Sequence, residues 1–317
     1  MEEYNHSRVN TDFILVGFTS LQNFQILLFC VFLMFYLIIL TSNLMILVAV
    51  LVDRNLHKPM YFFLTNLSVL DILCTTTTMP KMLAMYLMNA KTISFFGCFI
   101  QMYFFHSLTV TESLLLVVMA YDRYVAICSP LHYTTKMTKR VNIQLAAGAW
   151  MTALLIPVPA VIQTSQLSFC GPNMVYHCFC DHLAVLQTSC SDITSQTVLG
   201  FSIAMAVSGV PLMLVIFSYA NIIFSILKIN SKEGRHKAFS TCTSHLIVVF
   251  TFYTSIAVAY ISYRTDIPLD IHVLGNVVFA ILTPMVNPLI YTLRNREVKE
   301  AIAKCIHLKL SPLFENM

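Results

Sequence analysis

The sequence has few charged residues. Only 11% of its 317 residues are Asp, Glu, Lys or Arg, whereas soluble domains carry roughly 25%. The surface of a water-soluble protein of this length needs many more charged side chains than the 19 basic and 15 acidic ones present. Hydrophobic residues make up 57% of the chain, which excludes a disordered protein. The class that remains is an integral membrane protein.

Other features are scarce or missing as well. The sequence has 8 glycines and 11 prolines, which excludes a collagen-like or low-complexity chain. Its net charge of +4 and its lack of a basic stretch with interleaved aromatics argue against a nucleic-acid partner. No HExxH, GxSxG or paired-aspartate motif is present, so we predict that the protein is not an enzyme.

The apolar residues form long runs. A helix needs about 20 predominantly apolar residues to cross a bilayer. Seven segments satisfy this, and they predict an all-α membrane protein: a single seven-transmembrane helix bundle, with an N-terminal segment 1–23, the bundle in 24–293 and a tail 294–317. The segments are 13–52, 59–86, 95–128, 141–180, 193–227, 238–263 and 271–293.

Lysine and arginine indicate the orientation of the bundle. Of the 19 basic residues, 15 lie at the end of the first, third, fifth or seventh segment or in the stretch that follows it. The positive-inside rule therefore predicts a cytoplasmic C-terminus and an extracellular N-terminus. On the predicted outer side, Asn5 begins an Asn-His-Ser glycosylation sequence. The acidic start at Glu2 and Glu3 lacks the basic region of a cleaved signal peptide, so we expect the first span to be an uncleaved signal-anchor.

The tail has its own pattern. Val298, Ile302, Ile306 and Leu310 recur every four residues, with basic residues between them. This spacing predicts a short amphipathic C-terminal helix lying on the inner leaflet of the bilayer.

Five motifs, in order along the chain, resemble those of rhodopsin-like (class A) G-protein-coupled receptors, and among these the odorant (olfactory) receptors. One departure is that Ser42 precedes Asn43 where the family usually has glycine. The five motifs are Leu56-His57-Lys58-Pro59-Met60-Tyr61-Phe62-Phe63-Leu64, Met119-Ala120-Tyr121-Asp122-Arg123-Tyr124-Val125-Ala126-Ile127-Cys128, Ser218-Tyr219, Lys237-Ala238-Phe239-Ser240-Thr241-Cys242-Thr243-Ser244-His245 and Pro284-Met285-Val286-Asn287-Pro288-Leu289-Ile290-Tyr291.

The resemblance implies a multi-pass receptor of the plasma membrane. Such a receptor binds a small, volatile or moderately polar odorant in the outer half of its bundle and activates a stimulatory heterotrimeric G protein, which raises cyclic AMP. No resident cofactor is implied. A different class also remains open: a transporter or channel that moves a small solute or proton past Asp71 and Glu112. Ligand-evoked cyclic AMP without flux separates the two.

The resemblance also points to an activation switch. Asp122-Arg123-Tyr124 places an ion pair at the cytoplasmic end of the third span, and breaking that pair frees the guanidinium for other partners. The alternative is an arginine that extends to the membrane surface. The resemblance adds further switch residues: Tyr219, His245, Asn287, Pro288 and Tyr291.

Two acids lie inside apolar spans. An intramembrane charge costs several kcal/mol and is a functional candidate. Asp71 and Glu112 could share a proton or hold a sodium ion, with Asn43 and Asn287 as hydrogen-bond donors; the resemblance implies such a site. The alternative is a pair of neutral acids that make structural hydrogen bonds.

Cysteines and histidines are clustered between the fourth and fifth spans, in His177-Cys178-Phe179-Cys180-Asp181-His182. The outer compartment is oxidising, which favours disulfides over a metal site. The resemblance assigns Cys98–Cys180 and Cys170–Cys190 and leaves Cys178 unpaired. Metal binding by Cys178, His177 or His182 stays open as the alternative.

A ligand pocket is expected between the third, fifth and sixth spans, mostly apolar with few polar groups. His106 and Arg264 are both basic and near the outer mouth, so together they could hold a carboxylate. Alternatively, Arg264 extends to water or pairs with Asp266, and His106 bonds to a neighbouring helix. The predicted pocket residues are Phe105, His106, Thr109, Ser113, Ile203, Val207, Tyr253, Ile256, Ala257, Tyr260 and Arg264.

Overall fold

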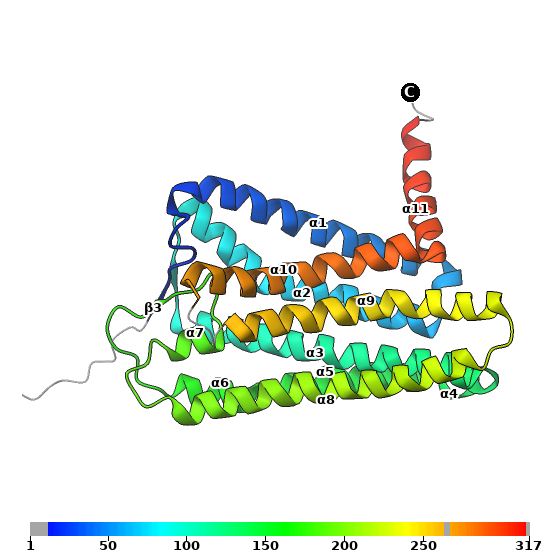
Figure 1. Cartoon of the computed structure of the whole chain (residues 1–317). Coiled ribbons are helices and arrows are strands. Elements are labelled where there is room, and N and C mark those ends of the chain that lie inside the picture. Colours follow the sequence, from blue (N-terminus) through cyan, green and yellow to red (C-terminus); the bar gives the residue numbers. More distant parts are fainter. Residues whose placement is uncertain (1–11, 263–266, 315–317) are drawn as a thin grey trace, which may run out of the picture.

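A computed structural model of the chain describes residues 12–262 and 267–314 (Figure 1). Its seven long helices are each long and apolar enough to cross a membrane, as predicted. The predictions for Asn5, Arg264 and Asp266 lie outside the described residues. The spans are α1 (Gln25–Val52), α2 (Pro59–Met88), α3 (Phe95–Cys128), α5 (Lys139–Leu155) continued by α6 (Val158–Ser165), α8 (Thr194–Leu227), α9 (Lys232–Ser262) and α10 (Leu269–Arg294).

Capping side chains and prolines set several helix boundaries. The Ser94 side chain accepts from the backbone N–H of Gly97 at the start of α3, and Thr138 caps α5 in the same way. Pro59 occupies the first turn of α2, where its missing N–H costs nothing. Pro157 separates α5 from α6, because a proline inside a helix removes a backbone hydrogen bond.

Short elements connect the spans. On the side of the molecule that carries α11 (Arg296–Phe314), these are η2 (Arg54–Leu56), η3 (Pro130–His132) and α4 (Tyr133–Lys136). At the opposite end lie η1 (Gln22–Phe24) and α7 (His182–Leu186). Most of the connections are short, the one between α6 and α8 being the long exception, and neighbouring spans run antiparallel in Figure 1.

The structure also contains a small sheet that the sequence did not predict. Its strands are β1 (Phe13–Leu15), β2 (Thr92–Ile93) and β3 (Met174–Val175), in the order β2-β1-β3. The strand β1 pairs antiparallel to β2 and parallel to β3. Both Phe13 and Leu15 are fully buried, so this N-terminal segment packs onto the end of the bundle instead of extending from it.

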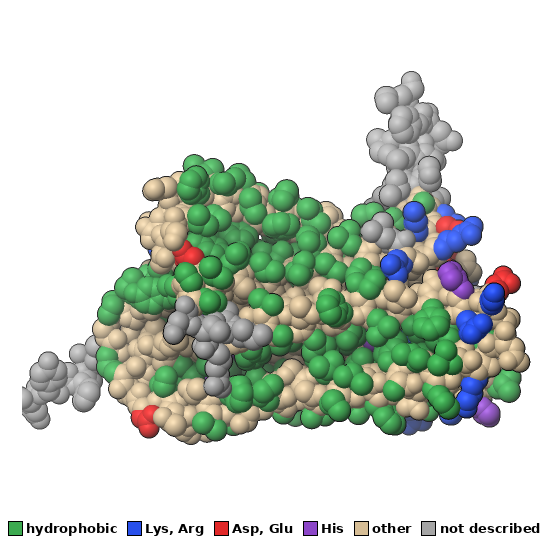
Figure 2. All heavy atoms as spheres, in the orientation of Figure 1, with side chains coloured by type: hydrophobic (Ala, Val, Ile, Leu, Met, Phe, Trp, Pro, Cys, Tyr) green, Lys and Arg blue, Asp and Glu red, His purple; other side chains and the backbone are tan. Residues whose placement is uncertain are grey.

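The outer surface of the bundle suits a lipid environment. Exposed apolar side chains are abundant on α1 and α8, for example Ile26, Leu51 and Phe217. Figure 2 shows hydrophobic side chains along the length of the bundle, whereas Lys and Arg gather at the end that carries α11. A bilayer would cover the first surface and leave the second in water.

The C-terminal helix α11 is amphipathic, as predicted. Val298, Ala301 and Ile302 are buried and belong to the hydrophobic core, while Arg296 on the exposed face pairs with Glu300 one turn later at 2.7 Å. Lys304 reaches Asp53 beyond the end of α1, with 3.3 Å between Nζ and Oδ2. The helix leaves the bundle at a steep angle in Figure 1, as expected for a helix that lies along the membrane surface.

Candidate functional site

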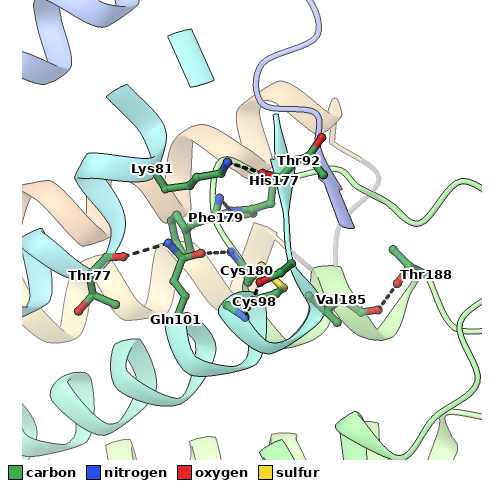
Figure 3. The surroundings of a disulfide bond; sticks show 12 residues. Thr77, Lys81, Thr92, Cys98, Gln101, His177, Phe179, Cys180, Val185 and Thr188 are labelled. Atoms are coloured by element: carbon green, nitrogen blue, oxygen red, sulfur yellow. Dashed lines mark hydrogen bonds between the residues drawn. A yellow bond between two sulfur atoms is a disulfide. The ribbon is translucent and has the colours of Figure 1, made fainter. Parts of the chain in front are cut away.

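Two disulfides hold the segment between α6 and α8. Cys98 at the start of α3 is bonded to Cys180, with 5.4 Å between their Cα atoms, and Cys170 is bonded to Cys190 at 5.8 Å. Both pairings agree with those that the family resemblance implied. In Figure 3, Gln101 lies beside the first disulfide: its side chain donates to Thr77 O and accepts from the N–H of Cys180, both at 2.9 Å.

Cys178 is not part of a disulfide. Its side chain is fully buried, and its sulfur lies 3.4 Å from the Tyr86 hydroxyl. Burial raises the pKa of this thiol to about 12, so it stays protonated. The two nearby histidines have different hydrogen-bond partners. His177 Nδ1 accepts from Phe179 N at 3.3 Å, whereas His182 bonds to Thr164. Within residues 12–262 and 267–314, no three His, Cys, Asp or Glu side chains are placed to hold a metal ion.

A cavity of about 710 Å³ lies in the outer half of the bundle. Its walls are mainly apolar, which suits a small apolar ligand. Eight of the eleven predicted pocket residues line it: Phe105, His106, Thr109 and Ser113 from α3, Ile203 and Val207 from α8, and Ile256 and Tyr260 from α9.

Two predicted residues on α9 are not cavity-lining. Ala257 is exposed on the outside of the helix, because the stripe of α9 that faces the cavity runs through Phe252, Ile256 and Ala259. The placement of Ala257 in the pocket was therefore wrong by one position around the helix. Tyr253 lies beyond the cavity wall, with its hydroxyl 3.0 Å from Ser113 Oγ.

Other cavity residues were not predicted from the sequence. Asn276 and Phe279 contribute a wall from α10, and α7 covers the outer side. The polar Asn276 within an apolar span is the sequence feature that could have indicated that α10 contributes to the cavity. Nothing in the periodicity of the sequence indicates which way the loop around α7 turns. The α7 region supplies Asp181, His182, Leu183, Leu186 and Gln187.

His106 is the basic side chain of α3 in this cavity. Its side chain is 29% exposed, and its Nε2 atom lies 4.0 Å from Asp181 Oδ1, beyond hydrogen-bond distance. Nε2 makes no hydrogen bond to any residue that the structure describes. The alternative of a bond from this nitrogen to a neighbouring helix is therefore not what the structure shows.

The two intramembrane acids meet in the middle of the bundle. Asn287 Nδ2 lies 3.1 Å from Asp71 Oδ1 and 3.0 Å from Glu112 Oε1, so one amide joins α2, α3 and α10. All three side chains are buried. Asn43 is not part of this contact, because its Nδ2 donates to the backbone oxygens of Ile39 and Pro284.

The predicted ion pair closes the inner end of α3. Arg123 Nη2 lies 2.5 Å from Asp122 Oδ2, and both side chains are buried. The arginine therefore does not extend to the membrane surface. Tyr133 of α4, which the sequence did not reveal, donates to Asp122 Oδ1 at 2.7 Å, and burial raises the pKa of its hydroxyl. Tyr124 of the same motif is half-buried and stacks on Tyr121, with 6.4 Å between the centroids of the two rings.

The other predicted switch residues lie near this pair. Tyr219 OH is 2.8 Å from His245 Nδ1, and His245 Nε2 is 3.1 Å from Leu116 O, which links α8, α9 and α3. The buried Tyr291 hydroxyl makes no hydrogen bond within the described residues. Pro288 lies inside α10, where it removes a backbone hydrogen bond.

A second cavity, of about 630 Å³, lies at this inner end. The polar side chains in its walls include Asp122, Arg123, Tyr133, His245 and Tyr291. Across it, Lys58 at the start of α2 pairs with Glu297 of α11, with 2.7 Å between Nζ and Oε2. The pairing with Lys58 lowers the pKa of Glu297, so its carboxylate is ionised at neutral pH.

Comparisons with known proteins agree with this arrangement. The chain is 61% identical to human olfactory receptor 2AT4 over 293 residues, 92% of each chain, and 45% identical to human olfactory receptor 6N1 over 304 residues, 96% of this chain and 97% of that one. Squid rhodopsin has the same fold, with a TM-score of 0.74 at 16% identity over 92% of this chain and 82% of that one. A family model described as "Olfactory receptor" matches residues 30–309. The chain belongs to the olfactory receptor family of G-protein-coupled receptors, and it is therefore a receptor and not an enzyme.

Proposed function

We propose that this receptor binds its odorant in the outer cavity and activates a stimulatory heterotrimeric G protein, which raises cyclic AMP. The observation that carries the proposal is the pair of cavities at opposite ends of one bundle, one mainly apolar and one lined by the buried ion pair. A mainly apolar cavity suits a small volatile molecule. A cavity next to a breakable ion pair suits a protein partner that recognises only one of two states.

The helix α9 provides the connection between the two cavities. Ile256 of α9 lines the outer cavity, and His245, three turns away on the same helix, lines the inner one. Between them, Ser113 Oγ lies 3.0 Å both from Val207 O and from Tyr253 OH, which joins α3, α8 and α9. A ligand that displaces α9 at Ile256 would strain the Tyr219–His245 bond and thereby bias the switch.

The proposed orientation has the N-terminus outside the cell and the C-terminus inside. The support is the gathering of Lys and Arg at the α11 end, where the inner cavity also lies (Figure 2). This orientation puts both disulfides on the oxidising side. It would also expose Asn5 to glycosylation.

We further propose that Asp71 and Glu112 hold a sodium ion or share one proton. The two buried carboxyl groups offer several acceptor oxygens, but the Asn287 amide is the donor that they share. A cation or a shared proton would satisfy the remaining acceptor oxygens. The Asn287 Oδ1 atom is also buried without a hydrogen-bond partner among the described residues, and it suits the same ion. If an Asp71→Asn variant kept the wild-type dependence of agonist potency on sodium and pH, this proposal would be wrong.

The decisive experiment expresses the receptor with a stimulatory G protein and screens a broad odorant panel for cyclic AMP. The expected result is a rise in cyclic AMP that Arg123→Ala abolishes at equal surface expression. Solute or proton flux through Asp71 and Glu112 without cyclic AMP would instead favour the transporter alternative. The same cells carry a cyclic AMP reporter, a pH indicator for proton flux and an uptake assay for solute flux.

A further inference from the structure

The hydrogen bonds of His182 determine which of its ring nitrogens carries the proton. Thr164 Oγ1 lies 2.8 Å from Ala160 O and 3.0 Å from His182 Nε2. A hydroxyl has a single hydrogen, and a carbonyl oxygen can only accept, so Thr164 donates to Ala160. The Thr164 oxygen must then accept a hydrogen bond from His182, which places the imidazole proton on Nε2.

This tautomer leaves a lone pair on the other ring nitrogen. Burial lowers the pKa of His182 to about 4, so the ring is neutral at physiological pH and Nδ1 is an acceptor. The side chain is only 7% exposed. The bond to Thr164 is the only hydrogen bond that His182 makes within the part of the chain that the structure describes. Unlike the Nε2 atoms of His106, His177 and His272, Nδ1 of His182 is not fully buried, so it remains open to a hydrogen bond from a ligand in the cavity.

Gly200 of α8 lies against the edge of the His182 ring that carries Nδ1 and Cε1. Both residues line the outer cavity. A Cβ atom at position 200 would lie 2.9 Å from His182 Nδ1 and 2.6 Å from Cε1, closer than two such atoms normally approach. The absence of a side chain at Gly200 therefore lets the imidazole lie against α8.

Three hydroxyl groups of this cavity have no hydrogen left to donate to a ligand. Thr109 donates to Phe105 O at 2.9 Å, Ser113 to Val207 O at 3.0 Å and Ser208 to Ala204 O at 2.7 Å. Each of these side chains has used its one hydrogen within the protein and can only accept from a ligand. Together with Nδ1 of His182, these three hydroxyl oxygens give the cavity a set of acceptors that a hydrogen-bond donor on the ligand can satisfy.

We propose that the cavity takes an apolar alcohol, whose hydroxyl donates a hydrogen bond to Nδ1 of His182 while its hydrocarbon body fills the apolar walls. This inference rests on the proposed ligand site and specifies its ligand class. An ether or ester of the same shape cannot donate. An ionised carboxylic acid would set its lone pairs against the lone pair of His182.

The experiment uses matched sets of compounds that share one hydrocarbon skeleton: an alcohol, its methyl ether and the corresponding carboxylic acid, over several linear and alicyclic skeletons. Cyclic AMP and receptor surface expression are measured together. The alcohol should be about tenfold more potent than its methyl ether, the factor that one well-made hydrogen bond provides. The acid should be the weakest of the three.

Variants of His182 test whether that preference arises at this residue. His182→Leu should abolish the tenfold difference between alcohol and ether. His182→Gln should restore part of it, because the amide N–H can bond to Thr164 while its carbonyl accepts from the alcohol. The matched control is His177→Leu, which alters a buried histidine of the same loop that does not line the cavity and should leave the difference intact.

Two results would overturn the inference: equal potency of alcohol and ether in the wild-type receptor, or a preference for alcohol that survives in a normally expressed His182→Leu variant. Thermal stabilisation of the purified receptor by the alcohol but not the ether provides a readout that does not require signalling. A receptor that responds to alcohols, ethers and acids alike contradicts the ligand class alone. A receptor that neither responds to nor is stabilised by any compound contradicts the proposed function itself.

Discussion

The two halves of the bundle differ in what fills the space between the helices. The outer half lies around His106 and Ser113, and the inner half around Asn287 and Arg123. The outer half surrounds a cavity of about 710 Å³ with mainly apolar walls, and disulfides hold the segments above it. The inner half is joined by hydrogen bonds between buried polar side chains, such as Asn287 to Asp71 and Tyr133 to Asp122.

The same helices build both halves. On α3, Phe105 and His106 line the outer cavity, and Arg123 pairs with Asp122 at the inner end. Hydrogen bonds in an apolar interior have strict geometry, so a small displacement changes which partners meet. Apolar walls tolerate changes of shape more readily. The comparison suggests that ligand choice can vary in the outer half while the inner half keeps two defined arrangements.

The largest expected effect comes from removing the covalent bonds of the outer half. Replacing Cys98 and Cys180 by serine opens a loop with a sequence separation of 82, and replacing Cys170 and Cys190 opens one of 20. Loop-closure entropy predicts losses of about 4.5 and about 3 kcal/mol respectively. Thermal unfolding of the purified variants measures both, and an equal or reversed order would show that chain entropy does not dominate here.

The next effect compares two asparagines of α10. Asn287→Leu leaves Asp71 and Glu112 without their shared donor, at a cost of about 3 kcal/mol or more. Asn276→Leu, its matched control in the outer half, removes only a bond to the backbone of His272 and should cost about 1 kcal/mol. Unfolding temperatures and surface expression measure the difference. Equal losses would mean that the inner network is no more important for stability than the cavity wall.

A smaller effect should follow from pH and should arise in the outer half. Burial lowers the pKa of both His177 and His182 from 6.5 to about 4. The unfolded chain therefore binds more protons between these values, so their stabilising contribution is complete above pH 6.5 and falls as the pH drops towards 4. Between pH 7.5 and 5.5 we expect a loss of about 2.7 kcal/mol from the pair.

The matched test of the pH effect removes one of the two titrating groups. A His182→Gln variant should lose roughly half of the drop in unfolding temperature between pH 7.5 and 5.5, because His177 still titrates. An undiminished drop would assign the pH dependence to groups other than this histidine.

Large parts of this structure were predictable from the sequence because they depend on composition over long stretches. Seven apolar runs gave the spans, and the motif around Asp122 and Arg123 gave the ion pair. The small sheet was not predictable, since strands of two or three residues such as β2 and β1 are too short to show a period. The pairing of Leu15 with Val175 depends on the folded path of the whole chain.

The candidate sites were predictable to a lesser degree. Helical spacing on α3 placed Phe105 and Thr109 correctly at the cavity, but the same reasoning on α9 included the outward-facing Ala257. An error of one residue rotates a side chain by about 100° around a helix axis, which is enough to move it from the cavity to lipid. The sequence indicates His182 only as a possible metal ligand and not as a cavity residue, because no periodic pattern connects a loop to the helices that it covers.

The smallest expected effect concerns the inner half and the hydroxyl that the sequence did not reveal. Tyr133→Phe removes the hydrogen bond to Asp122 Oδ1 but keeps the ring. Since one such bond contributes about 1 kcal/mol, the resting state should lose stability relative to the active state and ligand-free cyclic AMP should rise about fivefold. The matched control is Tyr121→Phe, because the exposed Tyr121 hydroxyl makes no hydrogen bond within the described residues, and it should leave basal cyclic AMP unchanged. An equal rise in both variants, or no rise in Tyr133→Phe, would show that the Asp122–Arg123 ion pair is held without α4. The inner half would then depend less on its hydrogen bonds than its contrast with the apolar outer half indicates.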